Sequence, residues 1–184
     1  MQLNIHILTH PIIRKLADEI TYKNSYEEPI SNDSEKILGM LIFYETLRKW
    51  LKIDNLYIKK VDIFKESYFS NQLDKYLIIT NIIECHNILA DVNKIIPKAH
   101  LRDMNLYSKI TPINYYTEQQ EYKIIIFEKF LKNFNIIKTI NYLQNNDEIN
   151  LNNIKIVCIT CNNNILKYIA QKYPRLNVYT TKII

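Results

Sequence analysis

Four polar residues that follow an apolar run are the first candidates for chemistry in this chain: Glu128, Lys129, Lys132 and Asn133. The run before them, Lys123–Phe127, is typical of a buried strand, and a helix is expected to begin soon after them. In an open α/β sheet, ligands bind outside the carboxyl ends of the strands, where a following helix presents N–H groups to an anion. The position therefore predicts a phosphate-binding turn at Glu128–Asn133.

The composition of that turn opposes the same prediction. A loop that wraps a phosphate uses glycines to bring backbone N–H groups close to the oxygens. The chain has a single glycine, Gly39, and the turn instead carries Phe130 and Leu131. Lys129 and Lys132 would attract an anion only as point charges, without a backbone cradle.

Three other groupings contain reactive side chains. Cys158 and Cys161 form a C-x-x-C at the end of an expected strand, but a structural zinc site needs two more ligands and redox pairs usually open a helix. His6 and His10 lie in an extended segment, where this spacing does not favour a shared metal. Glu84–His86 follows a strand, although an acidic first helical turn explains the glutamate equally well. We therefore expect no metal site from these residues.

The composition is that of a soluble globular protein with a modest positive charge. The 184 residues are 47% hydrophobic and 23% charged, with a net charge of +5. Because the lysines are scattered, solvated faces are expected rather than nucleic-acid binding. Three cysteines do not form a secreted disulfide framework, and no apolar stretch is long enough to span a membrane. We expect an intracellular, soluble protein with one domain over residues 1–184.

The pattern of apolar residues predicts a parallel sheet flanked by helices, because expected strands alternate with expected helices. A hairpin or flap is expected between Asn55 and Asp74. Strands are expected at 76–80, 123–127, 154–160 and 177–181, and helices at 82–96, 135–143 and 165–173, after a short N-terminal strand and helix within 5–20.

A long helix is expected from Asp33 to Leu51, after the N-capping residues Ser31, Asn32 and Asp33. Its apolar side includes Ile37, Leu41, Tyr44 and Leu47, widened by Met40, Phe43 and Trp50. So broad a face predicts cover by the sheet, by a second copy of the chain or by a partner subunit. Gly39 within this helix predicts a close approach of another element.

Motifs along nearly the whole chain resemble the uracil phosphoribosyltransferase family of bacteria and plastids. No single motif is specific to the family, but the order and spacing of the motifs together are specific. They are His10–Ile13, Ile42–Leu51, Ile96–Ala99, Pro112–Tyr116 and the final segment Lys155–Thr181.

The resemblance implies a type I phosphoribosyltransferase fold, commonly dimeric or larger. It also implies the transfer of phosphoribose from phosphoribosyl pyrophosphate to uracil, which gives UMP and pyrophosphate in pyrimidine salvage. Mg²⁺ is expected only if activity is retained. Abundant Tyr, Ile, Asn and Lys indicate an AT-rich coding sequence, and together with the resemblance this predicts a plastid protein; a cytoplasmic one is the alternative.

The family's phosphate loop aligns with Glu128–Ile136, so Glu128, Lys129, Lys132 and Asn133 are predicted to be a vestigial substrate site. The family's threonine, two glycines and serine are replaced there by Asn133, Phe134, Asn135 and Ile136. One arginine that binds pyrophosphate is replaced at Ile83, beside Glu84. A second falls at Asn105, with Arg102 and Lys109 nearby. The family's uracil-binding segment lies beyond Ile184, so the domain is expected to be C-terminally truncated.

Each lost charge-assisted hydrogen bond is worth roughly 1.5–3 kcal/mol, and four of them correspond to several powers of ten in affinity. The sequence therefore predicts a weak or inactive homologue with no assigned catalytic residue. One alternative is a non-catalytic regulatory or scaffold subunit that pairs through the helix Asp33–Leu51, and a less favoured one is an RNA-binding protein.

Overall fold

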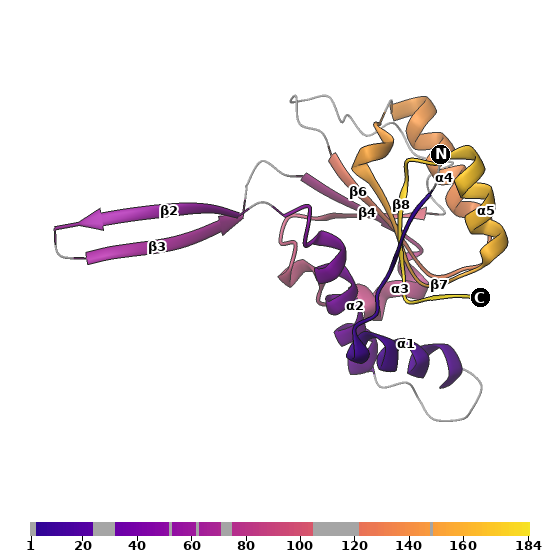
Figure 1. The fold of residues 1–184 in the computed structure, drawn as a ribbon, viewed down its shortest axis with the longest axis horizontal. Coiled ribbons are helices and arrows are strands. Elements are labelled where there is room, and N and C mark those ends of the chain that lie inside the picture. The colour runs from indigo at the N-terminus through magenta and orange to yellow at the C-terminus, as the bar shows by residue number, and fades with distance from the viewer. Residues whose placement is uncertain are drawn as a thin grey trace.

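A parallel sheet with helices on both faces forms the body of the protein (Figure 1). The computed structural model describes residues 3–23, 32–51, 53–61, 63–70, 75–104, 122–147 and 149–184. The strand order is β1-β8-β7-β6-β4-β5, and every pair along it is parallel. A short strand, β9, pairs with the far end of β7. The predicted α/β class is confirmed.

The strands are β1 (Asn4–Ile7), β2 (Ile53–Lys60), β3 (Ile63–Ser70), β4 (Lys75–Thr80), β5 (His100–Asp103), β6 (Tyr122–Leu131), β7 (Ile154–Cys161), β8 (Asn177–Thr180) and β9 (Lys182–Ile183). The helices are α1 (Pro11–Lys23), α2 (Asn32–Leu47), α3 (Ile82–Leu89), α4 (Asn135–Asp147) and α5 (Asn163–Lys172), with short 3-10 turns at Val92–Lys94 and Leu151–Asn153.

Two apolar layers hold the sheet between the helices. One layer joins α4 and α5 to one face, and the other joins α1, α2 and α3 to the opposite face. The central strand β7 is buried along its whole length, as expected for a strand covered on both faces. Neighbouring residues of the strands therefore point into different layers, which decides where each candidate residue lies.

Gly39 marks the closest approach between α2 and α3. A Cβ built on Gly39 would lie 2.0 Å from the backbone oxygen of Ile88, a distance that no side chain can occupy. Glycine therefore allows the two helices to touch, as the sequence predicted.

The apolar face predicted for α2 needs a correction. The helix ends at Leu47 rather than Leu51, and its fully buried large apolar residues are Leu38, Ile42, Phe43 and Leu47. Because α1, α3 and the sheet already cover that side, Ile37 and Tyr44 face outward, with about half of each side chain exposed.

The segment after α2 forms a hairpin that projects from the body (Figure 1). Strands β2 and β3 pair antiparallel, and Tyr57, Phe64 and Tyr68 are mostly exposed along them. The predicted hairpin is confirmed.

Two further differences concern element lengths. The helix expected at 82–96 ends at Leu89, and a 3-10 turn at Val92–Lys94 completes the connection. Strand β6 continues four residues beyond Phe127. The segment Pro112–Tyr116 lies outside the described residues. Among the helices within the described ranges, none is long and apolar enough to cross a membrane.

Candidate functional site

The expected phosphate-binding turn is much shorter than the sequence predicted. Strand β6 runs to Leu131, so Glu128 and Lys129 belong to the strand and not to a turn. Only Lys132, Asn133 and Phe134 connect it to α4, which begins at Asn135. Pairing with β7 explains the extension, because Phe130 and Leu131 are in register with Thr160 and Cys161. Three residues without a glycine cannot wrap a phosphate.

Glu128 points toward the layer of α4 and α5. It is in register with Cys158 of the neighbouring strand, which lies in that layer. Burial, and then the nearby Glu84 carboxylate, raise the pKa of Glu128 to about 7. Its Oε2 atom is buried and has no hydrogen-bond partner. A carboxylate in this position repels a phosphate.

Lys129 points to the opposite face of the sheet. Its Nζ atom lies 2.8 Å from Oε1 of Glu35, in the first turn of α2. The two side chains are only 18% and 7% exposed, so the pair is largely removed from water. The one lysine that β6 contributes at this end is therefore bound to a carboxylate of the chain itself.

Lys132 and Asn133 are exposed at the turn. The ammonium group of Lys132 lies 5.1 Å from the centre of the Phe130 ring. The four predicted site residues thus share one strand end but point in three directions: Glu128 into one layer, Lys129 into the other, and the remaining two into solvent. They do not converge on a single point.

Hydrogen-bond acceptors are common near the carboxyl ends of the strands. Asp103 accepts a hydrogen bond from the backbone N–H of Ile82, and buried oxygens of Glu35, Thr80 and Asn81 have no partner. Sequence reasoning missed Glu35, because an acidic first turn explains such a residue without any distant partner. Of the positions matched to the family's second arginine, Asn105 and Lys109 lie outside the described residues, and Arg102 lies on β5.

Cys158 and Cys161 are free, buried thiols within strand β7, and both lie in the apolar layer of α4 and α5. Contact with the Cys161 thiol and burial raise the pKa of Cys158 well above its usual value. Across the described ranges, no group of three or more His, Cys, Asp or Glu side chains could hold a metal ion.

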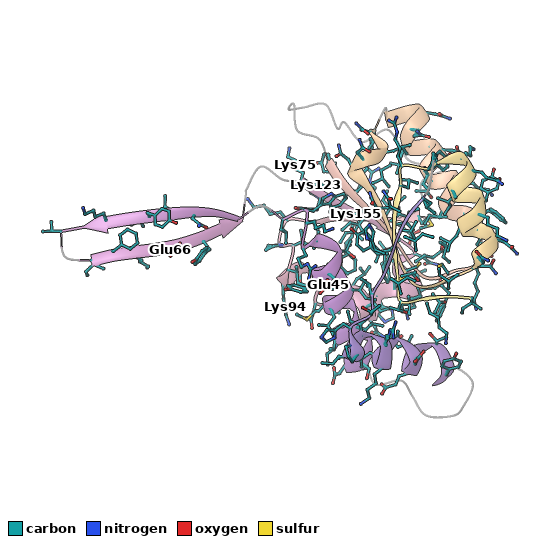
Figure 2. All side chains as sticks on the ribbon, in the orientation of Figure 1. Glu45, Glu66, Lys75, Lys94, Lys123 and Lys155 are labelled. Atoms are coloured by element: carbon teal, nitrogen blue, oxygen red, sulfur yellow. The ribbon has the colours of Figure 1, made fainter. Side chains whose placement is uncertain are left out.

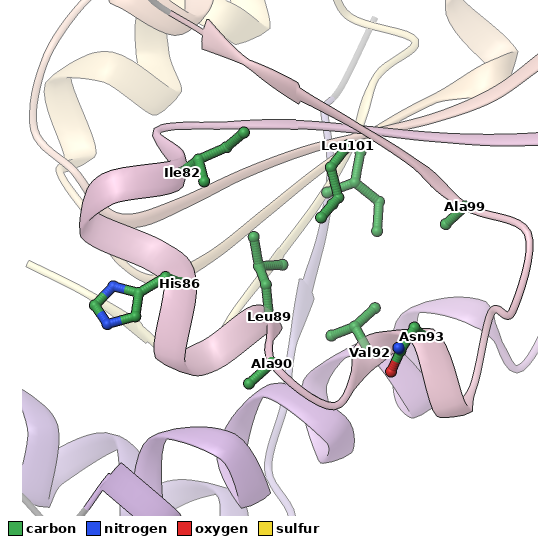
Figure 3. A pocket seen from close by; sticks show the side chains of 9 residues that line it. Ile82, His86, Leu89, Ala90, Val92, Asn93, Ala99 and Leu101 are labelled. Carbon is green, nitrogen blue, oxygen red and sulfur yellow. The ribbon is translucent and has the colours of Figure 1, made fainter.

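The histidines His6 and His10 lie in different surroundings. His6 stacks on the Tyr179 ring with centroids 4.5 Å apart, and His10 is exposed just before α1. His86 lies at an apolar pocket of about 260 Å³ between α3, the following 3-10 turn and β5 (Figure 3). None of the described residues that line this pocket is Asp, Glu, Lys or Arg, so they offer no strong charge to an anion.

Comparison with known proteins defines first the fold and then the family. The structure of the AQ2163 protein from Aquifex aeolicus superimposes with a TM-score of 0.67 at 18% identity, over 97% of this chain and 86% of that one. This likeness concerns the fold alone, a parallel sheet flanked by helices. No protein-family model matches the chain.

Two curated relatives are each named "Uracil phosphoribosyltransferase homolog". The relative from Porphyra purpurea is 31% identical over 184 residues, and the one from Pyropia yezoensis is 29% identical over 189 residues. Both matches cover 100% of this chain and 89% of the relative. The chain therefore belongs to the family of uracil phosphoribosyltransferase homologues, as its motifs indicated.

Proposed function

We propose that this chain is a uracil phosphoribosyltransferase homologue whose transfer reaction is weak or lost. The observation that carries the proposal is the continuation of β6 to Leu131, which leaves a three-residue connection without glycine where a phosphate would bind. The neighbouring charges support it. Lys129 is paired with Glu35, and Glu128 lies near Glu84.

Mg²⁺, the metal expected with this reaction, does not fit a site built from these side chains. Magnesium prefers several oxygen ligands around one point. At this end Glu128 and the Glu35–Lys129 pair lie on opposite faces of the sheet, and the described residues hold no cluster of three acidic or metal-binding groups. We derive no step through the metal.

The decisive measurement is UMP formation from uracil and phosphoribosyl pyrophosphate with Mg²⁺, beside an active uracil phosphoribosyltransferase. We expect a turnover more than tenfold below that of the active enzyme, because the lost contacts are worth several kcal/mol. A turnover within tenfold overturns the proposal. Calorimetric titration with phosphoribosyl pyrophosphate separates weak chemistry from absent binding.

A second candidate is a non-catalytic subunit that binds a protein through the outer side of α2. Ile37 and Tyr44 lie seven residues apart on this helix, on one side of it, and both are about half exposed. Light scattering of the wild type and of Ile37→Glu tests this candidate. A dimer or larger species that the substitution dissociates supports it, and a wild type that stays monomeric at high concentration excludes self-association.

We also propose that the protein resides in a plastid, on the basis of its AT-type composition and its family. A fluorescent fusion viewed in algal cells tests the location, and a signal confined to the cytoplasm overturns it.

A further inference from the structure

The apolar pocket of about 260 Å³ opens at the edge of the sheet, between α3, the 3-10 turn at Val92–Lys94 and strand β5 (Figure 3). At its base lies Ile78, a fully buried residue of β4 that is in register with Leu101 of β5. Leu89 and Val92 line its sides and are buried, while Leu101 is half exposed at the mouth. The pocket therefore reaches from solvent to the sheet itself.

Two alanines explain why the chain leaves this space unfilled. Ala90, directly after α3, and Ala99, directly before β5, both line the pocket. They are two of only four alanines in the chain. Protein interiors are otherwise packed with few voids larger than a water molecule, and a larger aliphatic side chain at either position would occupy the opening.

The chain that follows β5 starts out on the other face of the sheet. Ile78, Leu89 and Val92 belong to the layer of α1, α2 and α3. Met104, the residue directly after β5, is buried in the layer of α4 and α5. The described chain thus leaves β5 on the side away from the pocket.

Two polar side chains lie at opposite ends of the pocket: His86 on α3 and Asn93 in the 3-10 turn (Figure 3). The Nδ1 atom of His86 lies 2.9 Å from the carbonyl oxygen of Ile83, so this ring nitrogen is engaged within its own helix. The amide of Asn93 can both donate and accept hydrogen bonds. Asn93 is therefore the lining residue best suited to orient a ligand.

Charge selects against ions in this pocket. The described lining residues include no Asp, Glu, Lys or Arg. Lys94, labelled in Figure 2, belongs to the same 3-10 turn but does not line the pocket, and its ammonium group pairs with Asp91 at 2.8 Å. A charged ligand would lose hydration here without gaining a counter-charge from these residues.

The size of the pocket indicates the size of its ligand. An apolar cavity of roughly 150 Å³ lined by aliphatic and aromatic side chains stays dry and binds benzene. At about 260 Å³ this pocket has room for a second fused ring. A nucleobase is less suitable, because most of its polar edge atoms would remain unpaired against the aliphatic side chains.

We infer that the pocket binds a small uncharged bicyclic ring compound of the indole class. The apolar body of the ring lies against Ile78 and Leu89, and its single N–H group donates to the side-chain oxygen of Asn93. Burial of the ring supplies the affinity, and the hydrogen bond sets the orientation. The Lys132–Phe134 connection is not part of this pocket, so the inference does not depend on phosphoribosyl transfer.

The test is a titration of the full chain, labelled with ¹⁵N, in which indole is added and the backbone amide signals are followed by NMR. We expect saturable shifts at Ala90, Asn93 and Leu101, with a dissociation constant of about 1 mM or below, which is within reach of so small a ligand. Indole-3-acetate, which carries a carboxylate, and uracil, which has several polar edge atoms, should each bind roughly tenfold more weakly or less.

Ala90→Leu should weaken indole binding by about tenfold or more, because the added side chain occupies the mouth of the pocket. Ala90 is exposed, so this variant should keep the fold. Lys98→Leu is the matched control: it adds a leucine to the same connection at an exposed position that does not line the pocket. The control should bind indole as the wild type does.

Asn93→Ala separates burial of the ring from the hydrogen bond. This variant should bind indole roughly three- to tenfold more weakly than the wild type does. Its affinity for 1-methylindole, which has no N–H group, should equal that of the wild type. An equal loss for both compounds would overturn the assignment of Asn93 as the acceptor.

The inference as a whole is overturned if indole gives no saturable shifts up to about 10 mM. Binding that Ala90→Leu leaves unchanged would place the ligand elsewhere, and equal binding of uracil would mean that polar edges and not an apolar ring are recognised. Shifts at Ala90 and Leu101 that depend on protein concentration without ligand, and that Ala90→Leu removes, would show that a second copy of the chain fills the pocket instead.

Discussion

The two ends of the parallel sheet differ in charge, and in a direction opposite to that expected for this family. The carboxyl end, where a phosphate is expected, holds Glu84 and the half-buried Glu128, while its Lys129 is paired with Glu35. At the amino end, the described charged residues that act on Lys155 are the cations Lys49 and Lys123. A fold therefore fixes where a ligand can bind, but individual side chains decide which charge it must have.

One helix joins the two ends. The first turn of α2 supplies Glu35 to Lys129, and the carbonyls of Thr46 and Trp50, at and after its last turn, accept hydrogen bonds from Lys155 and Lys123. Four substitutions test how far this comparison holds.

The largest effect is expected from Lys129→Met. The Glu35 carboxylate would remain buried with neither oxygen paired, because its Oε2 atom already lacks a partner. We expect the free energy of unfolding, measured in urea, to fall by about 3 kcal/mol. The double variant Glu35→Gln/Lys129→Met should recover most of the loss, and Lys132→Met in the exposed turn should change little. Equal instability of the single and double variants would contradict a role for the pair.

Gly39→Ala should cost about 2 kcal/mol, because the added methyl group meets the backbone oxygen of Ile88 rather than a movable side chain. Since α2 reaches both ends, the substitution should also change the fluorescence of Trp50. Lys36→Ala on the same helix is the control, because its exposed pair with Asp33 contributes little. Thermal unfolding curves that coincide with the wild type would show that the helices can separate without cost.

Glu128→Gln should stabilise the protein at alkaline pH. The pKa of this carboxyl is raised to about 7 in the folded chain, from 4.5. Between these values the folded state binds more protons than the unfolded state, so wild-type stability falls as pH rises through this window. The variant lacks this loss and should be more stable by about 2 kcal/mol at pH 8, with little difference at pH 4.5. The same advantage at both pH values would mean that ionisation is not the cause.

Substitution of Lys155 should produce the smallest effect. Here the stability of the wild type should rise with pH, opposite to the dependence expected for Glu128. The pKa of Lys155 is lowered from 10.5 to about 8, so between these values the unfolded state binds more protons and stability rises with pH. Relative to Lys155→Met, the wild type should gain about 1 kcal/mol across this window. Parallel stability profiles for the two proteins would show that the amine does not titrate there.

The strands could be predicted because fully buried strands are continuous apolar runs, as in Tyr76–Thr80 and Ile154–Thr160. The sequence could not show whether the candidate site residues converge. Adjacent residues of a strand, such as Glu128 and Lys129, point to opposite faces. The turn was placed too early because Lys129 interrupts the apolar pattern, while pairing with β7 continues the strand. One signal was available and not used: Lys155 stands within an apolar strand, and a lysine there needs a specific partner.

The β2–β3 hairpin has a consequence for how this protein can change. Its described side chains belong to neither core cluster, and Val61 at its tip is almost fully exposed. Its length and sequence can therefore vary with little effect on the stability of the sheet, whereas nearly every change in β7 is felt by the core. Evolution can therefore alter the hairpin more freely than the central strand of the sheet.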